Sequence, residues 1–177
     1  MNDRKPFDLD EYIERIQSSP CFICEMIAGR LNGNHIIQQN DEFIIFLNKY
    51  PTLYGYTLVA PIRHKEQVTG DFSLDEYLAL QRAIYQTAEA VRKSVDAERV
   101  YILSLGSQQG NRHVHWHIAP LPFGVPFKEQ QIEALNIENG ILDMPDEDME
   151  KLARQIRENM SSMEQGNFNI PNRCLER

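Results

Sequence analysis

Three histidines alternate with apolar residues in the segment His113-Val114-His115-Trp116-His117, and the chain holds only five histidines in all. A two-residue period is that of a half-buried β-strand, so residues 113–119 are expected to form a strand that aims all three imidazoles at one face. Steps of two residues separate the outer rings by roughly 13 Å, which makes it hard for the three to share one small ion. We therefore expect them to have different tasks; the alternative is a strand that carries them as solvated polar residues.

The same residues resemble a known family. The His-x-His-x-His pattern, followed by Ile118 and Ala119, is similar to the motif of the histidine triad (HIT) nucleotide hydrolases and transferases. Upstream, residues 46–51 and 55–64 resemble the first half of that family's pattern in order and spacing. The resemblance covers roughly residues 21–123. The resemblance implies a HIT-like fold. Within the family, the chain is similar to the zinc-bearing branch and to the dinucleoside polyphosphate hydrolases and phosphorylases.

Composition limits the class of protein. A chain of 177 residues is in the one-domain range and can bury a substantial core. No apolar run approaches the ~20 residues that cross a bilayer, and the first residues lead into an acidic segment, so neither a membrane span nor a secretory signal is expected. A net charge of -8 argues against binding to a nucleic acid polymer. Three cysteines do not make a disulfide framework, which favours the cytoplasm.

The other patterns predict one α+β domain with a mostly antiparallel five-stranded sheet, because the strands are interrupted by a long helix. Alternation and turn residues predict strands over residues 35–38, 43–47, 57–60, 100–105 and 113–119. A capping box of Ser73 and Glu76 begins the long helix, which runs to Val95 with Leu74 and Leu78 on its apolar face.

Shorter helical patterns flank this domain. Short helices are predicted over residues 8–17 and 21–29, and the apolar spacing from Met149 to Met163 predicts a C-terminal helix. We expect an N-terminal helical extension over residues 1–20, a HIT domain over 21–126, and a C-terminal extension with a helix over 127–177.

Cys21 and Cys24 have a spacing that can place two thiolates on one metal ion. The same spacing would suit a redox pair or two core cysteines, although no βαβ unit surrounds it. In the zinc-bearing proteins that this chain resembles, the ligands are these two cysteines, the histidine that ends a Pro-x-x-His step and the first triad histidine. The resemblance therefore implies a structural zinc held by Cys21, Cys24, His64 and His113, with reduced, unliganded side chains as the alternative.

The central histidine of the triad has the chemistry of a nucleophile. A neutral imidazole can attack phosphorus if one ring nitrogen is held as a donor and the other is free. The resemblance makes His115 that nucleophile, through a covalent nucleotidyl intermediate, and makes His117 an assistant in the hydrogen-bond network around the phosphate. Histidine in the third position resembles the hydrolase branches, because the uridylyltransferase branch carries glutamine there.

A nucleotide also needs partners for its phosphates, ribose and base. The loop before the histidines offers hydroxyl and amide donors for phosphate in Ser107, Gln108 and Asn111, although a polar hairpin turn would suit the same residues. The resemblance places Asn48 at the ribose and Phe22 and Phe46 in the slot for the base, where either ring could equally be core. Tyr56 departs from the family, whose members usually have histidine there.

The resemblance carried by these residues implies a hydrolase that cleaves an AMP-linked phosphate, with a purine nucleotide such as a dinucleoside polyphosphate as the substrate. A phosphoramidase and a nucleotidyl transferase or phosphorylase are alternatives within the family. A metallohydrolase with a catalytic zinc on the histidines would leave Cys21 and Cys24 idle. A nucleotide-binding module without turnover is the non-enzymatic alternative.

The resemblance also implies a homodimer in which two sheets extend across a two-fold axis near the long helix. Tyr77, Leu80, Ile84 and Tyr85 widen the apolar surface of that helix beyond one stripe, which is compatible with a dimer contact. A helix broadly buried within one chain is the alternative.

Overall fold

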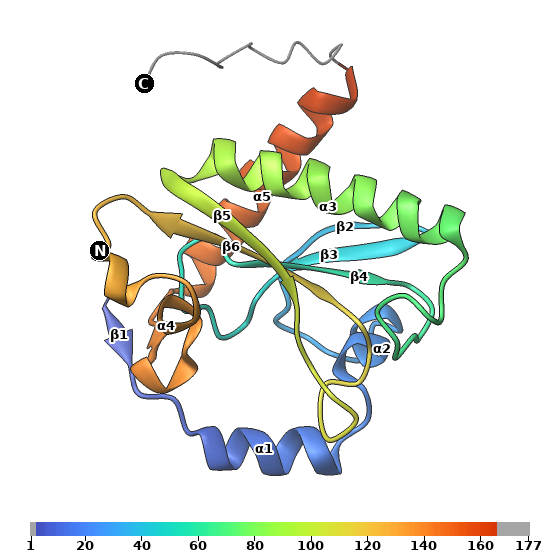
Figure 1. Cartoon of the computed structure of the whole chain (residues 1–177), viewed down its shortest axis with the longest axis horizontal. Coiled ribbons are helices and arrows are strands. Elements are labelled where there is room, and N and C mark those ends of the chain that lie inside the picture. The colour runs from blue at the N-terminus through green and yellow to red at the C-terminus, as the bar shows by residue number, and fades with distance from the viewer. Residues whose placement is uncertain (1–2, 166–177) are drawn as a thin grey trace.

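The chain folds around a five-stranded antiparallel sheet with the strand order β2-β3-β4-β6-β5 (Figure 1). The computed structural model describes residues 3–165, so part of the predicted C-terminal extension lies outside the described residues. The strands are β2 (Ile36–Gln39), β3 (Phe43–Leu47), β4 (Thr57–Pro61), β5 (Ala97–Ser104) and β6 (Trp116–Pro122). A separate pair joins β1 (Arg4–Lys5) to β7 (Ile141–Leu142). The predicted α+β class is confirmed.

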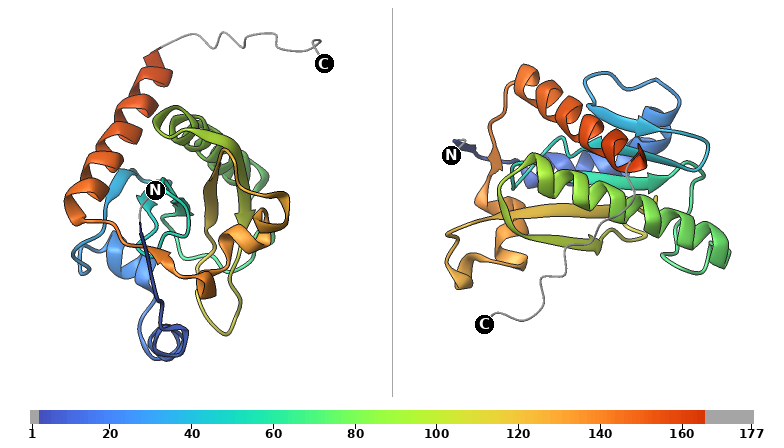
Figure 2. Two further views of the ribbon diagram at one scale, coloured as in Figure 1. Left: turned by 90° about the vertical axis from the view of Figure 1, so that its left-hand side faces the viewer. Right: turned by 90° about the horizontal axis from the view of Figure 1, so that it is seen from above.

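Two long helices, α3 (Leu74–Ser94) and α5 (Asp146–Gln165), cover one face of the sheet and pack against each other (Figure 2). The predicted capping box begins α3: the Glu76 backbone N–H donates to the Ser73 hydroxyl, and the Ser73 N–H donates to the Glu76 carboxylate. The predicted C-terminal helix is also present, and its apolar stripe from Met149 to Met163 is buried. Within residues 3–165 no helix is both long and apolar enough to span a membrane.

Shorter elements cover the opposite face of the sheet. They are α2 (Phe22–Ile27) and α4 (Ile132–Leu135), which contribute Ile23, Met26 and Ala134 to the core cluster on that face. Two 3-10 turns, Phe127–Glu129 and Ile137–Asn139, flank α4 and have no buried residue. Because both faces are covered, β3 and β4 are buried along their whole length. Their two-residue period sends Ile45 and Val59 toward α3 and α5, and sends Phe46 and Leu58 toward α2.

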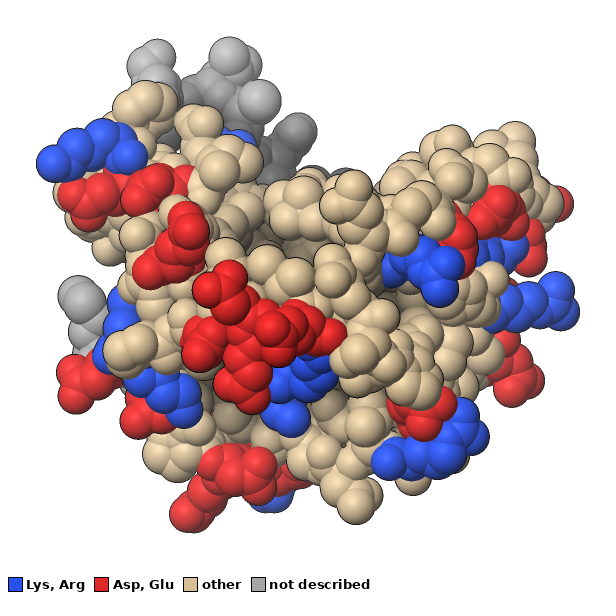
Figure 3. Space-filling model, turned by 90° about the horizontal axis from the view of Figure 1, so that it is seen from below, with Lys and Arg blue, Asp and Glu red and all other residues tan. Residues whose placement is uncertain are grey.

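The N-terminal helix α1 (Leu9–Ser18) lies apart from both layers and has no buried side chain. It begins at Asp8, whose carboxylate accepts the Glu11 backbone N–H. Asp and Glu side chains gather at the centre of the face on which α1 lies (Figure 3), and Asp10, Glu11 and Glu14 of this helix are exposed. Such a face repels a polyanion.

Two details of the sequence prediction are wrong. Leu74 and Leu78, which were expected on the apolar face of α3, are 71% and 54% exposed, because the buried side chains of this helix begin at Leu80. The histidine strand begins at Trp116 rather than at residue 113: the Val114 N–H donates to the Lys65 carbonyl in the loop after β4, outside the sheet ladder.

Candidate metal centre and histidine site

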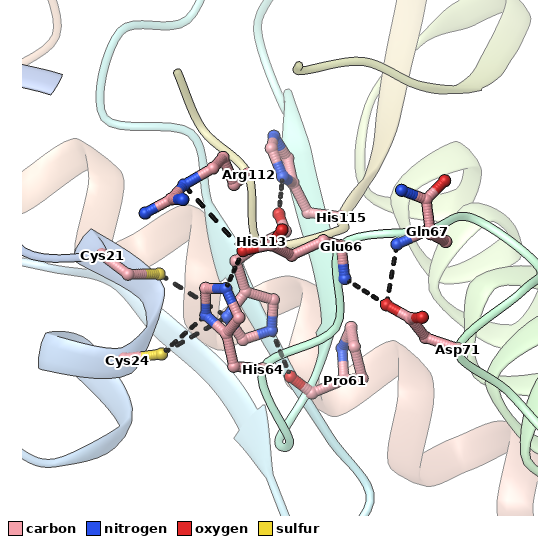
Figure 4. Close-up of polar contacts among 10 residues, drawn as sticks. All are labelled: Cys21, Cys24, Pro61, His64, Glu66, Gln67, Asp71, Arg112, His113 and His115. Atoms are coloured by element: carbon pink, nitrogen blue, oxygen red, sulfur yellow. Dashed lines mark hydrogen bonds and ion pairs between the residues drawn. The ribbon is translucent and has the colours of Figure 1, made fainter. Parts of the chain in front are cut away.

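Four side chains from three distant segments meet at one end of the sheet (Figure 4). Cys21 is the N-cap residue of α2 and Cys24 lies in the first turn of that helix, so their three-residue spacing places both thiols on the same side of the helix. His64 follows β4, and His113 lies in the irregular segment before β6. The structure brings together the four residues that the family resemblance named, since their potential ligand atoms all lie within 4.8 Å of one another.

The spacing of these atoms fits a metal ion. The Cys24 Sγ lies 3.3 Å from the His64 Nδ1 and 3.5 Å from the His113 Nδ1, and the Cys21 Sγ lies 3.6 Å from the His113 Nδ1. In a tetrahedral zinc site with ordinary bond lengths, sulfur and nitrogen ligands are about 3.6 Å apart. Two thiols and two imidazoles at these distances can hold a metal ion of that kind.

The ring nitrogens of both histidines are arranged for metal binding. The His113 Nε2–H donates to the Pro61 carbonyl at 2.9 Å, which leaves the Nδ1 lone pair facing the sulfurs. The His64 Nε2 faces the Glu66 carboxylate at 3.1 Å, so its Nδ1 likewise turns to Cys24. Burial lowers the pKa of His113 to about 4, which keeps this imidazole neutral, the form that binds a metal.

His115 lies next to this cluster and is almost completely buried, with 3% of its surface exposed. Its Nδ1–H donates to the His113 carbonyl at 2.7 Å, so the Nε2 keeps a free lone pair. Burial lowers the pKa of His115, because charging the ring there would require desolvating a cation. A neutral imidazole with one nitrogen tied down and the other free is a competent nucleophile.

His117 completes the row and contacts a residue that the sequence did not connect with it. Its ring lies 4.8 Å from the His115 ring, and its Nδ1 lies 3.0 Å from the Tyr56 hydroxyl. Its Nε2 is buried and has no hydrogen-bond partner within the part of the chain that the structure describes. Desolvation lowers the pKa of His117 to about 3. The only signal in the sequence was the tyrosine at a position where relatives usually have histidine.

The structure brings the aromatic pair that was expected at the base next to His115. The Phe22 ring lies edge-on to the His115 ring, with their centroids 6.2 Å apart, and edge-on to Phe46 at 6.3 Å. Asn48 follows β3, and its side-chain oxygen accepts the Tyr50 backbone N–H at 2.9 Å. Phe22, Phe46 and His115 thus lie together, with Asn48 at the end of the strand that carries Phe46.

The predicted phosphate loop is a tight hairpin. The Ser107 and Gly110 backbones exchange two hydrogen bonds, and the Ser107 hydroxyl accepts the Gln109 N–H. The Asn111 amide donates to the Tyr12 hydroxyl of α1 at 2.9 Å, and Gln108 hydrogen-bonds to the Glu66 carboxylate. Asn111 and Gln108 therefore contact protein groups, and the role of Ser107, Gln108 and Asn111 toward phosphate stays a prediction.

Known proteins share both the sequence pattern and the fold. A family model described as the HIT domain matches residues 30–123, a range that includes His64 and the three clustered histidines and begins after Cys24. An uncharacterized HIT-like protein of Saccharolobus solfataricus is 34% identical over 124 residues, which cover 64% of this chain and 88% of that protein.

Solved structures have the same fold. A hypothetical histidine triad nucleotide-binding protein from Sulfolobus tokodaii superposes with a TM-score of 0.66 at 23% identity, over 81% of this chain and 94% of that one. A zinc-bound histidine triad family protein from Mycobacterium smegmatis superposes with a TM-score of 0.62 at 22% identity, over 82% and 96% of the two chains.

Proposed function

The protein belongs to the HIT domain family, whose model spans more than half of the chain, and from that premise we propose that it is a nucleotide hydrolase acting at an AMP-linked phosphate. A purine nucleotide of the dinucleoside polyphosphate type is the proposed substrate. The observation that carries this proposal is the state of His115: buried, neutral, with Nδ1–H given to the His113 carbonyl and Nε2 free.

The proposed reaction has two displacements at one phosphorus. The His115 Nε2 attacks the phosphorus bonded to the nucleoside, the N–P bond forms, and the P–O bond to the leaving phosphate breaks with its electron pair on that oxygen. The leaving phosphate departs as an anion and needs no proton. Water then attacks the same phosphorus, the N–P bond breaks, and its electron pair returns to Nε2. The water oxygen keeps one proton as the P–OH group of the released AMP and gives the other to solvent. The His113 carbonyl stabilises the positive ring between the two displacements.

The residues around His115 suit the parts of a nucleotide. We assign Phe22 and Phe46 to the base, since their rings adjoin the nucleophile. Asn48 is assigned to the ribose hydroxyls, and Ser107, Gln108 and Asn111 to the phosphates. Binding phosphate would require Gln108 and Asn111 to exchange their present partners for substrate oxygens.

We propose zinc as the ion of the cluster formed by Cys21, Cys24, His64 and His113. Four protein ligands leave no open position for water or substrate, so the ion would supply structural cross-linking rather than chemistry. This ligand set separates the proposal from a metallohydrolase, whose zinc needs a free coordination position. Within residues 3–165, Cys21 and Cys24 form no disulfide, which favours a reducing compartment, and we propose a cytoplasmic location.

A homodimer through the β5 edge of the sheet is proposed as the assembly. The opposite edge is blocked, because the Arg157 guanidinium of α5 donates to the carbonyls of Ile36 and Ile37 on β2. At the β5 edge, Ile102 and Leu105 are 49% and 51% exposed. An open edge with exposed apolar side chains supports pairing with a second copy.

Trapping the covalent intermediate tests the function. The protein is mixed with a diadenosine polyphosphate, quenched in base, digested and analysed by mass spectrometry, because phosphoimidazoles survive in base. We expect an adenylyl group on the peptide that contains His115, and release of AMP. His115→Asn should show neither, while binding the substrate with an affinity within about threefold of wild type.

His35→Asn is the matched control, since this imidazole lies at α5, with its Nε2 3.1 Å from Asp146. Its turnover should equal that of wild type. Turnover by His115→Asn, or an adduct on another residue, would overturn the mechanism. Faster AMP transfer to inorganic phosphate or to an amine than to water would replace the hydrolase with a phosphorylase or transferase.

A further inference from the structure

The Tyr56 hydroxyl and the His117 imidazole form a hydrogen-bonded pair beside His115. Tyr56 is 5% exposed, and its oxygen lies 3.0 Å from the His117 Nδ1. The other ring nitrogen, Nε2, has no hydrogen-bond partner among the described residues, although it is shielded from solvent. A buried polar nitrogen without a partner is costly, so an acceptor group of a ligand that reached this atom would remove that cost.

The hydrogen bond between Tyr56 and His117 can have either of two directions, and these differ in which donor and acceptor groups they leave without a partner. If the tyrosine hydroxyl donates to Nδ1, the ring proton is on Nε2, and one N–H group lacks an acceptor. If Nδ1–H donates to the tyrosine oxygen, the hydroxyl hydrogen and the Nε2 lone pair both lack partners. The first arrangement leaves fewer unsatisfied groups and is therefore the more stable one.

We propose that Tyr56 is a positioning residue that holds the ring proton of His117 on Nε2, so that His117 presents an N–H donor to an oxygen of the reacting phosphate. The catalytic part of this inference rests on the proposed function of His115. No proton is transferred: His117 stays neutral and stabilises negative charge by a hydrogen bond, an interaction that is strong in a water-excluded site.

The surroundings keep both members of the pair in the required form. Burial raises the pKa of Tyr56 to about 12, so its hydroxyl stays protonated and able to donate. Desolvation keeps the His117 ring neutral near pH 7. The Tyr56 carbonyl accepts the Asn48 N–H at 2.8 Å, and the Tyr56 N–H donates to the Leu53 carbonyl at 3.2 Å, so the backbone sets the position of the ring.

The tautomer of His117 can be measured on the unmodified protein, without any assumption about substrate. Long-range proton–nitrogen correlation spectra of the nitrogen-15-labelled full-length chain at pH 7.5 distinguish Nε2–H from Nδ1–H, and His117→Gln identifies the signals. We expect Nε2–H. An Nδ1–H ring would overturn the proposal. An Nε2–H ring in a protein that turns over no nucleotide would support the assigned tautomer and count against the proposed function alone.

Tyr56→Phe then tests the positioning role, since it removes the hydroxyl and keeps the ring. We expect a mixture of both tautomers, and a kcat about tenfold lower with KM within about twofold, the scale of one lost hydrogen bond. The control is Tyr101→Phe, which removes a hydroxyl that accepts the Gln131 N–H instead, and which should keep the tautomer and kcat of wild type. Tyr56→Phe that retains a pure Nε2–H ring and wild-type kcat would overturn the proposal; if this variant does not fold, the wild-type spectrum decides.

Discussion

Cys24→Ala is expected to remove the metal-dependent part of the protein's stability. The Cys24 sulfur lies within 3.5 Å of the Nδ1 atoms of both His64 and His113. An ion there would cross-link Cys24 to His64, which are 40 residues apart along the chain. Closing a loop of that length contributes about 4 kcal/mol to the free energy of unfolding in the chain-entropy description. For a chain of this size, the melting temperature should fall by roughly 8–16 °C.

The assay compares wild type and Cys24→Ala, each with and without a metal chelator. Trp116 is the single tryptophan and is 5% exposed, so its fluorescence reports unfolding of the sheet. The chelator should lower the melting temperature of wild type to that of the variant and leave the variant unchanged, because both then lack the same cross-link. Metal analysis of wild type prepared without chelator should find about one zinc per chain.

Two results would refute this reasoning. Wild-type protein without zinc would reject the four-ligand assignment. If Cys24→Ala still melts at a lower temperature than wild type in the presence of chelator, the lost stability would come from packing of the thiol, because the metal is then absent from both proteins.

Three further predictions concern assembly, pH and the turn before β4. Light scattering at micromolar concentration should give roughly twice the chain mass of 20.6 kDa, and Ile102→Glu at the β5 edge should give the monomer; a monomeric wild type would contradict the dimer. Because the folded pKa of His117 is lowered to about 3, the unfolded chain binds one more proton below its ordinary pKa near 6.5. The contribution of neutral His117 to the free energy of unfolding is thus fully present above pH 6.5 and is lost as pH falls toward 3. Urea titrations of His117→Gln should show a smaller loss of stability over this window than wild type, and equal slopes would speak against the shift. Gly55 has φ +89 and a Cβ there would lie 2.9 Å from Val95, whereas Gly33 has φ +72 and open space around it. Gly55→Ala should therefore lower the unfolding free energy by about 1–3 kcal/mol more than Gly33→Ala, and equal losses would exclude a steric cause.

Local patterns in the sequence predicted the elements well, because they depend on residues close together along the chain. The all-apolar run Phe43–Leu47 became β3 at its predicted bounds. The reciprocal bonds of Ser73 and Glu76 begin α3 where the capping box placed them. Family resemblance named the four residues of the metal cluster, although the family model itself begins after Cys24.

Other features depend on contacts between distant segments, which periodicity does not encode. Leu74 and Leu78 were expected on the apolar face of α3 but are exposed, because the buried side chains of this helix begin at Leu80. Where that burial begins depends on the sheet and on α5, which follows more than fifty residues later. The first two histidines alternate like strand residues, yet they lie outside β6. There the Val114 N–H donates to the loop after β4, and His113 to the Pro61 carbonyl.

The sequence by itself therefore determined the fold class, the helix start at Ser73 and the residue types available for metal binding and for nucleophilic attack. Only the tertiary structure decided which nitrogen of each imidazole is free, because that depends on which carbonyl, thiol or hydroxyl lies within hydrogen-bond distance of the other nitrogen. His113 turns Nδ1 to the sulfurs, and His115 keeps its Nε2 free. His117 meets Tyr56, 61 residues away along the chain. Three alternating histidines thus receive different surroundings from the segments that pack around them.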